Sequence, residues 1–256
     1  MNTLTSEERF RVQDYKFEKS DFYHYFKTLY KDRGYKAFYQ FNNRPHRRKY
    51  SRSLIKMFSP RGYGLEIGCG ARTICPTDRT ILSDGFQEHG VHDSIAKVFF
   101  KGDTIPYDSD SFDFLLSEHV LEHIANPIKA LKEWLRVLRS EGILYIFLPH
   151  MKRTNDKYRS ITTLDHLIED YKNNTPYNDG THYDDWIQNV VKKGLMPSHY
   201  QRMDKQELLN SASIHHHVWT EKEIIELFNY LNLEILFVDE KVKDRRDSFA
   251  VIARKK

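Results

Sequence analysis

An α/β fold with a doubly wound, mostly parallel sheet is predicted by three features of the sequence. Short apolar runs alternate with helical segments from residue 63 onward, and each run ends at a glycine or an acidic residue. Strands that are buried on both faces of a parallel sheet show this pattern, because helices cover both sides. With 256 residues, of which 39% are hydrophobic and 14% aromatic, the chain is long enough for one large core with additional segments.

The strands of the first half are expected at residues 63–68, 79–85, 96–103, 111–118 and 142–149. A helix between the last two of these strands is the clearest prediction. Asn126 is suited to cap it, Pro127 to occupy its first position, and Gly142 follows its end. Its apolar face repeats at intervals of three and four residues through Ile128, Leu131, Leu135 and Leu138. This alternation is typical of a doubly wound sheet.

The last predicted elements are a helix and two strands. Thr220 and Glu223 have the spacing of a capping box in front of this helix. Its apolar residues are Ile224, Leu227, Phe228 and Leu231. Strands are expected to follow at residues 233–240 and 248–254.

A glycine-rich turn follows the first predicted strand. Gly68 and Gly70 lack a Cβ, so a ligand can approach the backbone at the carboxyl edge of the sheet, where open α/β sheets bind ligands. The pattern is E-x-G-x-G, and Thr73 stands where a dinucleotide fingerprint would have its third glycine. Glu66 is an acid where a phosphate site would avoid one. The turn therefore favours a cationic ligand over a pyrophosphate.

Acidic residues also stand at the ends of the next strands. Asp84 can accept hydrogen bonds from both hydroxyls of a ribose, and Asp103 can accept one from the amine of an adenine. Taken singly, such an acid is more often an ordinary turn residue, but four acids in register with a glycine turn indicate an adenosine with a positive group above Glu66. The predicted cofactor-binding residues are Glu66, Gly68, Cys69, Gly70, Asp84, Gly102, Asp103 and Glu118.

The segment LEIGCGA at residues 65–71, with the run from KGDTIPYDSDSFDF to GILYIFLP, resembles the class I S-adenosylmethionine-dependent methyltransferases over residues 60–150. The resemblance implies S-adenosylmethionine as cofactor, Asp84 as the ribose-binding acid, and a Rossmann-like sheet of seven strands that ends in an antiparallel hairpin. SEHVLEH is similar to the branch that methylates small molecules. One departure is ARTICPTDR, which contains a proline and is short for the helix usual at this place.

The chain is expected to divide into four parts. These are a helical N-terminal cap at 1–60, a cofactor-binding core at 61–149, a substrate lid at 150–218, and a C-terminal helix with the last two strands at 219–256. The cap holds 14 Lys or Arg against 6 Asp or Glu, concentrated at 44–52 among aromatic residues. A solvated basic face is the preferred interpretation. The alternative is a surface for phosphate, an anionic carrier lipid at a membrane, or nucleic acid, of which nucleic acid is the least expected.

The predicted lid is an insertion of about 70 residues between the fifth strand and the last helix. An insertion at this place would overhang the transferred methyl group. Its mixture of polar and aromatic side chains suits a sugar. The segments TTLDHLIEDY at 162–171 and HHHVWT at 215–220 resemble methyltransferases of bacterial surface-polysaccharide synthesis. The predicted substrate-binding residues are Arg153, His166, Asp170, His182, His215 and His217.

The histidines of the lid allow three interpretations. His166 and Asp170 lie one helical turn apart, and His215 and His217 would share one face of an extended segment. Such groups are able to ligate a divalent metal, to contact the substrate, or to form ordinary structural hydrogen bonds. Substrate contacts are favoured, and no metal is predicted.

His119, directly after the fourth strand, is the candidate general base, while His123 is interpreted as a packing or capping residue. The predicted function is therefore O-methylation of a sugar hydroxyl in a surface glycan or its activated precursor. The alternatives are methylation of RNA or another polyanion, and methylation of another small metabolite. A non-catalytic cofactor-binding module has no support in the sequence.

A cytoplasmic location is expected from three features. The chain has only two cysteines, no apolar stretch long enough for a membrane span, and an N-terminus without the apolar core of a signal peptide.

Overall fold

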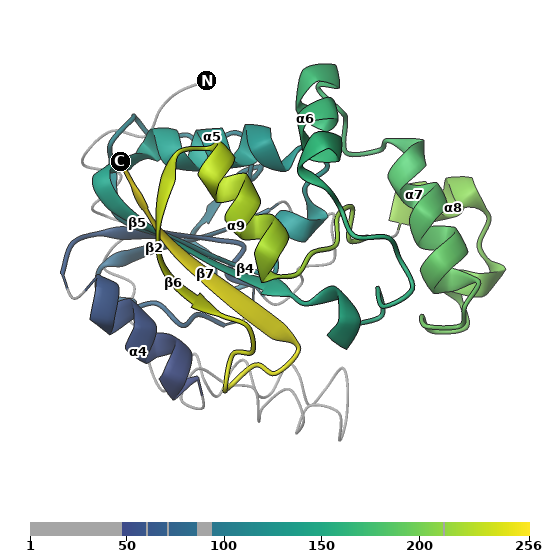
Figure 1. Ribbon diagram of the computed structural model, residues 1–256, viewed down its shortest axis with the longest axis horizontal. Helices are drawn as coiled ribbons and strands as arrows, with labels where there is room; N and C mark the ends of the chain where they lie inside the picture. The colour runs from purple at the N-terminus through teal and green to yellow at the C-terminus, as the bar shows by residue number, and fades with distance from the viewer. Residues whose placement is uncertain (1–47, 60, 71, 86–93, 212) are drawn as a thin grey trace.

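The computed structural model describes residues 48–59, 61–70, 72–85, 94–211 and 213–256 (Figure 1). Their centre is a seven-stranded sheet with the order β3-β2-β1-β4-β5-β7-β6. The strands are β1 (Gly64–Ile67), β2 (Thr80–Asp84), β3 (Val98–Phe99), β4 (Phe112–Glu118), β5 (Leu138–Pro149), β6 (Leu233–Asp239) and β7 (Ser248–Lys255). Neighbouring strands are parallel from β3 to β5, whereas β7 is antiparallel to both β5 and β6. The predicted fold class is confirmed.

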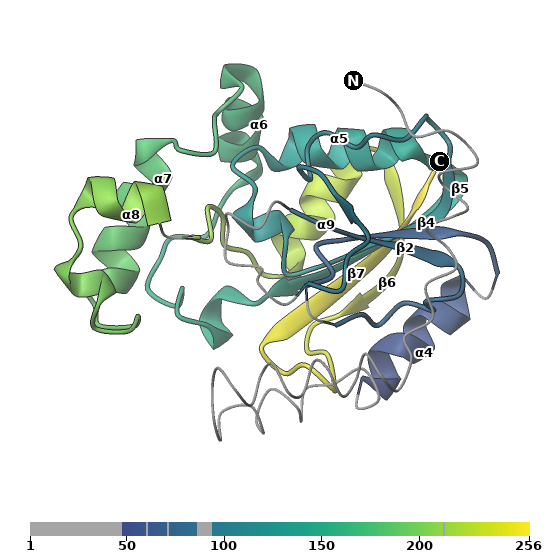
Figure 2. The same cartoon turned by 180° about the vertical axis from the view of Figure 1, so that it is seen from behind.

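Helices cover both faces of the sheet (Figures 1 and 2). The α-helices are α4 (Lys49–Phe58), α5 (Pro127–Val137), α6 (Leu164–Asn173), α7 (Gly180–Trp186), α8 (Lys205–Ser211) and α9 (Glu221–Tyr230). Short helical turns are η4 (Leu121–His123), η5 (Met151–Arg153), η6 (Ile187–Val191) and η7 (Tyr200–Arg202). α5 and α9 lie on one face and α4 on the other.

The core has two layers because alternate side chains of a strand point to opposite faces. Leu115 of β4 packs in the cluster that contains Leu131 of α5 and Leu227 of α9. Its neighbour Phe114 packs instead in the cluster that contains Leu54 and Ile55 of α4. The central strands are therefore apolar throughout, as the sequence pattern predicted.

The caps of two helices are those expected from the sequence. The Asn126 side chain accepts a hydrogen bond from the Lys129 amide at 3.0 Å, and Pro127 is the first residue of α5. Thr220 and Glu223 form both bonds of the capping box at the start of α9. Only the end of α5 differs, because Leu138 pairs with Phe112 of β4 and begins β5. The fifth strand therefore starts earlier than residue 142.

The segment between β1 and β2 contains no helix over its described residues 72–79. This agrees with the departure from the family pattern noted in ARTICPTDR. The Arg79 side chain holds this connection by donating to the carbonyl oxygens of Ser59, Gly62 and Arg61.

The insertion after β5 extends to one side of the sheet, where α7 and α8 lie farthest from the strands (Figure 1). It has a small core of its own, formed by Tyr183, Trp186, Val190, Val191, Leu208 and Ile214. The chain returns to the sheet at Trp219, which pairs with His150 in an isolated bridge. Over the described ranges we find no helix with the length and apolar character needed to cross a bilayer. The predicted basic cap lies mostly outside the described residues, since 1–47 are not among them.

Candidate active site

The turn after β1 has the backbone that its glycines were predicted to allow. Gly68 and Gly70 have φ values of +72° and +54°, and the amides of Gly68 and Cys69 donate to the Ser83 carbonyl at 2.9 and 3.0 Å. A Cβ at Gly68 would lie 2.2 Å from Val120, so packing itself requires glycine there. A Cβ at Gly70 would meet no described atom within 4 Å. Among the described residues, the turn is therefore open above Gly70.

Asp84 ties this turn to the end of β2. Its Oδ2 accepts hydrogen bonds from the Gly70 amide at 3.0 Å and the Ser94 hydroxyl at 2.6 Å, and its Oδ1 accepts one from the Gly85 amide at 2.8 Å. The carboxylate is thus held beside the open side of Gly70. Its predicted role as the ribose-binding acid stays a prediction.

Glu66 is enclosed behind the turn. Its side chain is buried, and its Oε2 accepts a hydrogen bond from the Thr73 hydroxyl. Burial raises the pKa of Glu66 to about 8, and the nearby charge of Glu118 acts in the same direction, while the Thr73 hydrogen bond opposes it. The carboxyl group therefore keeps its proton at neutral pH in this state of the protein. Its predicted contact with a cationic group stays a prediction.

We expect this buried carboxyl group to make the free energy of unfolding depend on pH. The unfolded chain releases the proton near the ordinary pKa of 4.5, whereas the folded chain holds it to about 8, so rising pH between these values lowers the free energy of unfolding. Glu66→Gln cannot titrate. The stability of Glu66→Gln relative to wild type should therefore increase as the pH rises through this range, by about 1.4 kcal/mol per pH unit.

Denaturant unfolding at several pH values between about 5 and 8, without cofactor, measures this difference. Glu226→Gln, at an exposed position of α9, serves as the control and should show no such trend. A constant difference between Glu66→Gln and wild type across the range would show that Glu66 is ionised in the folded protein.

Glu118 and Asp103 already have cationic partners. Glu118, the last residue of β4, lies 2.6 Å from both Arg48 and Arg245. Burial alone would raise the pKa of Glu118, but Arg245 and Arg48 outweigh it and hold the pKa below its usual value. Asp103 pairs with Lys129 at 3.1 Å. Both remain predicted cofactor contacts.

Gly102 and Cys69 complete the predicted cofactor set. The Gly102 carbonyl accepts a hydrogen bond from the Trp134 indole at 2.6 Å, which fixes the loop after β3 against α5. Cys69 is buried in the turn, and burial raises the pKa of its thiol above the usual range. It is therefore protonated at neutral pH.

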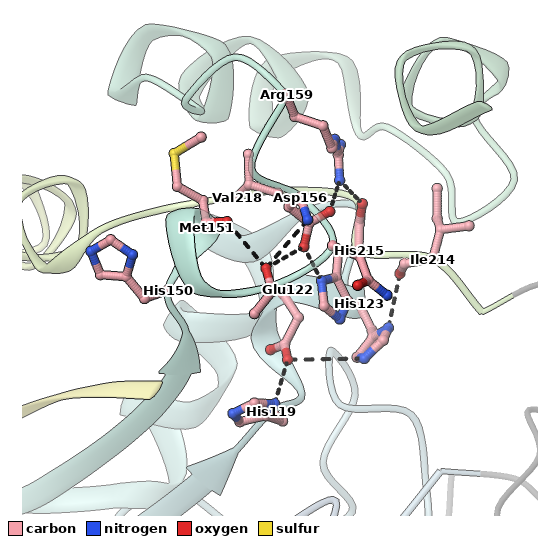
Figure 3. A network of polar contacts seen from close by, with 12 residues as sticks. His119, Glu122, His123, His150, Met151, Asp156, Arg159, Ile214, His215 and Val218 are labelled. Carbon is pink, nitrogen blue, oxygen red and sulfur yellow. Dashed lines mark hydrogen bonds and ion pairs between the residues drawn. The ribbon is translucent and has the colours of Figure 1, made fainter. Parts of the chain in front are cut away.

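His119 lies directly after β4 with a left-handed backbone, φ +56°. Its Nε2 lies 2.7 Å from the Ser248 hydroxyl, and its Nδ1 lies 3.6 Å from Oε1 of Glu122 (Figure 3). Burial lowers its pKa well below the usual value, and the positive charge of Arg245 adds to this effect. The ring is therefore neutral at physiological pH, as a general base must be. Non-glycine residues with this backbone are uncommon and concentrate at functional sites.

Glu122 joins His119 to a network of polar groups, in which sequence reasoning missed the roles of Glu122, Asp156 and Arg159 (Figure 3). Glu122 is fully buried, its carboxyl oxygens have no hydrogen-bond partner among the described residues, and burial raises its pKa to about 7. Asp156 lies 2.6 Å from Nδ1 of His215 and is also bonded by Arg159. The repeated Glu-His pairs of SEHVLEH, four residues apart, were the available signal for Glu122. Asp156 and Arg159 had no comparable signal.

A cavity of about 420 Å³ opens where this network meets the insertion. It is lined by His119, Pro149, Arg153, Thr154, Asn155, Asp156, Trp186, Met196, Ser213, His215 and Asp247. Among the predicted substrate-binding residues, Arg153 and His215 are part of this lining. Arg153 is fixed there by bonds to the carbonyl oxygens of Arg246 and Glu240.

The other four predicted substrate-binding residues lie together elsewhere. His166, Asp170, His182 and His217 form one compact group, and none of them is among the described residues that line the cavity. His215 and His217 do not share a site, because the chain bends at His216. Their predicted alternation onto one face assumed a fully extended segment.

Comparison with known proteins identifies the central part of the chain. Residues 65–146 match the model of a methyltransferase domain family. An uncharacterized protein of Methanocaldococcus jannaschii is 34% identical over 96 residues, which are 36% of this chain and 47% of that protein. An uncharacterized 37.1 kDa protein of a Streptomyces fradiae transposon is 33% identical over 96 residues, which are 34% of this chain and 28% of that protein. The similarity thus spans half or less of each of these relatives.

Solved structures with similar folds include two methyltransferases. A Thermotoga maritima enzyme described as a possible histamine N-methyltransferase is 17% identical. The match covers 91% of this chain and 100% of that chain, with a TM-score of 0.47. The 1,6-didemethyltoxoflavin-N1-methyltransferase of Burkholderia thailandensis, solved with its substrate and S-adenosylhomocysteine bound, is 12% identical. The match covers 100% of this chain and 92% of that chain, with a TM-score of 0.48. From the family match together with the E-x-G-x-G turn and Asp84, residues 65–146 are a methyltransferase domain of the class I S-adenosylmethionine-dependent type, with S-adenosylmethionine as its methyl donor.

Proposed function

We propose that the whole chain is an O-methyltransferase that acts on a hydroxyl group of a sugar, in a glycan or its activated precursor. The observation that carries this proposal is the composition of the cavity beside His119. Its lining comes from the sheet edge and from the insertion, and it combines hydrogen-bonding side chains with the indole of Trp186. Planar rings pack against the apolar faces of sugars, while polar side chains bind the hydroxyl groups.

The charges around the cavity argue against a polyanionic acceptor. Asp156 and Asp247 are in the lining together with Arg153, so acids are at least as prominent there as the cation. The basic segment at 44–52 was the reason to consider RNA or an anionic carrier. Its Arg48 is buried, however, and is paired with Glu118 and with Asp244 of the β6–β7 connection. A neutral sugar ring in the cavity fits these charges better, so the anionic part of an activated precursor would lie outside it.

Methyl transfer to a hydroxyl group has three requirements. Methyl transfer is an in-line displacement, so the acceptor oxygen must be aligned with the donor, and water must be excluded. The acceptor hydroxyl must also lose its proton. His119 lines the cavity with a neutral ring and lies at the edge of the sheet that holds the methyl donor. It is the group proposed to accept this proton.

Formation of S-adenosylhomocysteine with different acceptors tests the proposal. We expect turnover with nucleotide-linked sugars or oligosaccharides and none above background with RNA oligonucleotides. Methylation of RNA, with every glycan acceptor inactive, would instead support the polyanion alternative.

Arg153→Ala should lower kcat/KM for the acceptor by at least about tenfold, or 1.4 kcal/mol, because it removes the cation from the cavity wall. Affinity for S-adenosylmethionine, measured by calorimetry, should stay near that of wild type. Arg202→Ala, at an exposed position of the insertion, is the matched control. Loss of cofactor affinity in Arg153→Ala would mean that the insertion and the cofactor site are one unit.

A further inference from the structure

A second cluster of histidines lies outside the cavity. His166 and Asp170 come from one face of α6, His182 from α7, and His217 from the segment that returns to the sheet. Each offers one nitrogen or oxygen, and these four atoms all lie within 4.8 Å of one another. Residues that are up to 51 positions apart in the sequence thus converge on a single point.

The separations between these atoms match those of a tetrahedral metal site. Oδ2 of Asp170 lies 3.3 Å from Nε2 of His166, 3.5 Å from that of His182 and 3.7 Å from that of His217. The two nitrogens of His166 and His182 are 3.2 Å apart. Zinc bonds of about 2.0–2.2 Å at tetrahedral angles place neighbouring ligand atoms roughly 3.3–3.6 Å apart. A small cation in the centre would therefore need little movement of the side chains.

The cluster is buried, and its central carboxylate oxygen is not satisfied without such a cation. The side chains of Asp170, His182 and His217 are 8%, 4% and 0% exposed. Within the described part of the chain, Oδ2 of Asp170 is buried without a hydrogen-bond partner. An unpaired buried carboxylate oxygen costs free energy, and a bound cation removes this cost.

Surrounding groups orient two of the side chains. Oδ1 of Asp179 lies 3.2 Å from Nδ1 of His182, which leaves Nε2 of this ring with a lone pair toward the cluster. Nε2 of His217 lies 3.2 Å from the Ala125 carbonyl oxygen, which accepts from an N–H, so this ring binds a metal through Nε2 only if its proton moves to Nδ1 and this hydrogen bond is lost. The Asn126 side chain donates to the Asp170 carbonyl at 3.0 Å and fixes this end of α6.

We propose that His166, Asp170, His182 and His217 bind one Zn²⁺ ion in a closed structural site. Three imidazole nitrogens and one carboxylate are ligands that zinc accepts, and four protein ligands leave no open position for a substrate or water. The ion would fasten α6, α7 and the segment around residue 217 to one another. It would act on stability and on the shape of the insertion, and proton removal from the acceptor would remain with His119.

A smaller group, Glu122, His123 and His215, is a weaker candidate for a metal. Nδ1 of His123 contacts the Ile214 carbonyl at 2.8 Å and Nδ1 of His215 contacts Asp156 at 2.6 Å, so each ring keeps Nε2 for a ligand. Nε2 of His123 lies 3.9 Å from Glu122. This group has one ligand fewer, so we assign the metal to the four-residue cluster.

Elemental analysis of the full-length protein, expressed without an affinity tag and reconstituted with Zn²⁺, tests the site. We expect one zinc per chain after removal of loosely bound metal. Asp170→Asn and His166→Ala should each lose it, and His166 is the mildest position because its side chain is 45% exposed. His199→Ala, on an exposed part of the insertion, and His215→Ala should both retain one zinc.

Two further measurements do not depend on enzymatic activity. Cobalt substituted for zinc should give the intense visible absorption of a tetrahedral site, and the Asp170→Asn protein should lack it. A chelator should lower the melting temperature of wild type but leave that of Asp170→Asn unchanged. Circular dichroism shows whether each variant is folded.

Three results would overturn the proposal. The first is wild-type protein without stoichiometric zinc after reconstitution. The second is full zinc retention by both Asp170→Asn and His166→Ala. The third is loss of zinc in His215→Ala with retention in Asp170→Asn, which would place the metal at Glu122, His123 and His215.

Discussion

Gly70→Leu should weaken the binding of S-adenosylmethionine by well over tenfold, or about 1.4 kcal/mol. A side chain at this position would meet no described atom of the protein within 4 Å, so it would project into the open side of the turn, where the methyl donor is expected to approach the backbone. Isothermal titration calorimetry measures the loss. Gly68 is less suitable for this test, because its Cβ would strike Val120 and disturb the fold.

Gly194→Leu is the matched control for Gly70→Leu. Gly194 also has a left-handed backbone, with φ +70°, but it lies in the insertion, and a Cβ there would meet only ordinary contact with Gln201. Its backbone strain should therefore lower stability to a similar extent without affecting cofactor affinity. Asp84→Ala should weaken binding by more than tenfold through loss of the ribose acceptor. Unchanged affinity in folded Gly70→Leu and Asp84→Ala would contradict the assignment of the cofactor site.

His119→Asn should lower kcat by on the order of 10²-fold or more, with little change in cofactor affinity. Asparagine tolerates the left-handed backbone of residue 119, so the change removes the imidazole without adding backbone strain. Single-turnover assays with saturating donor measure the chemical step. His199→Asn, at an exposed position, controls for the loss of a histidine.

The pH dependence of wild type supplies a second test of His119. A general base must be deprotonated, so activity falls when the pH drops below its pKa. Burial and Arg245 place that pKa well below 6.5, and Glu122, His123, His215 and Arg48 are the other titratable or charged groups that act on the ring or contact it. The rate should therefore stay nearly constant down to about pH 6.5 and decline only in more acidic solution. A decline centred above this value, or wild-type kcat in His119→Asn, would exclude His119 as the base.

The sequence alone was sufficient for the elements whose signals are local. Strands were recognised because central parallel strands are apolar on both faces. The helices α5 and α9 were recognised because the residues that form each N-terminal cap are close together in the sequence. The E-x-G-x-G turn was recognised for the same reason. The two glycines follow β1, and Asp84 is the last residue of β2. Because β1 and β2 are parallel neighbours, their carboxyl ends, and therefore these residues, lie at the same edge of the sheet.

Long-range contacts were not accessible in this way. Arg48 was counted in a basic surface segment, yet it is buried against Glu118 and Asp244, since an ion pair between distant residues leaves no periodic pattern. The end of α5 was placed too late, before Gly142, because Leu138 fits the helical spacing, but pairing with Phe112 in the sheet decided the conformation of Leu138. Tertiary hydrogen bonds overrode local propensity there.

The amino-acid sequence by itself determined that this protein has a doubly wound sheet with a glycine turn after its first strand, because strand burial, helix capping and turn geometry depend on neighbouring residues. Only the tertiary structure decided which histidines of the insertion belong together. A bend at His216 sends His215 toward Asp156 and the cavity, while His217 reaches Asp170 on α6. Residue spacing predicts a shared face only while the backbone remains regular, and the path of an irregular segment is set by the packing of the elements around it.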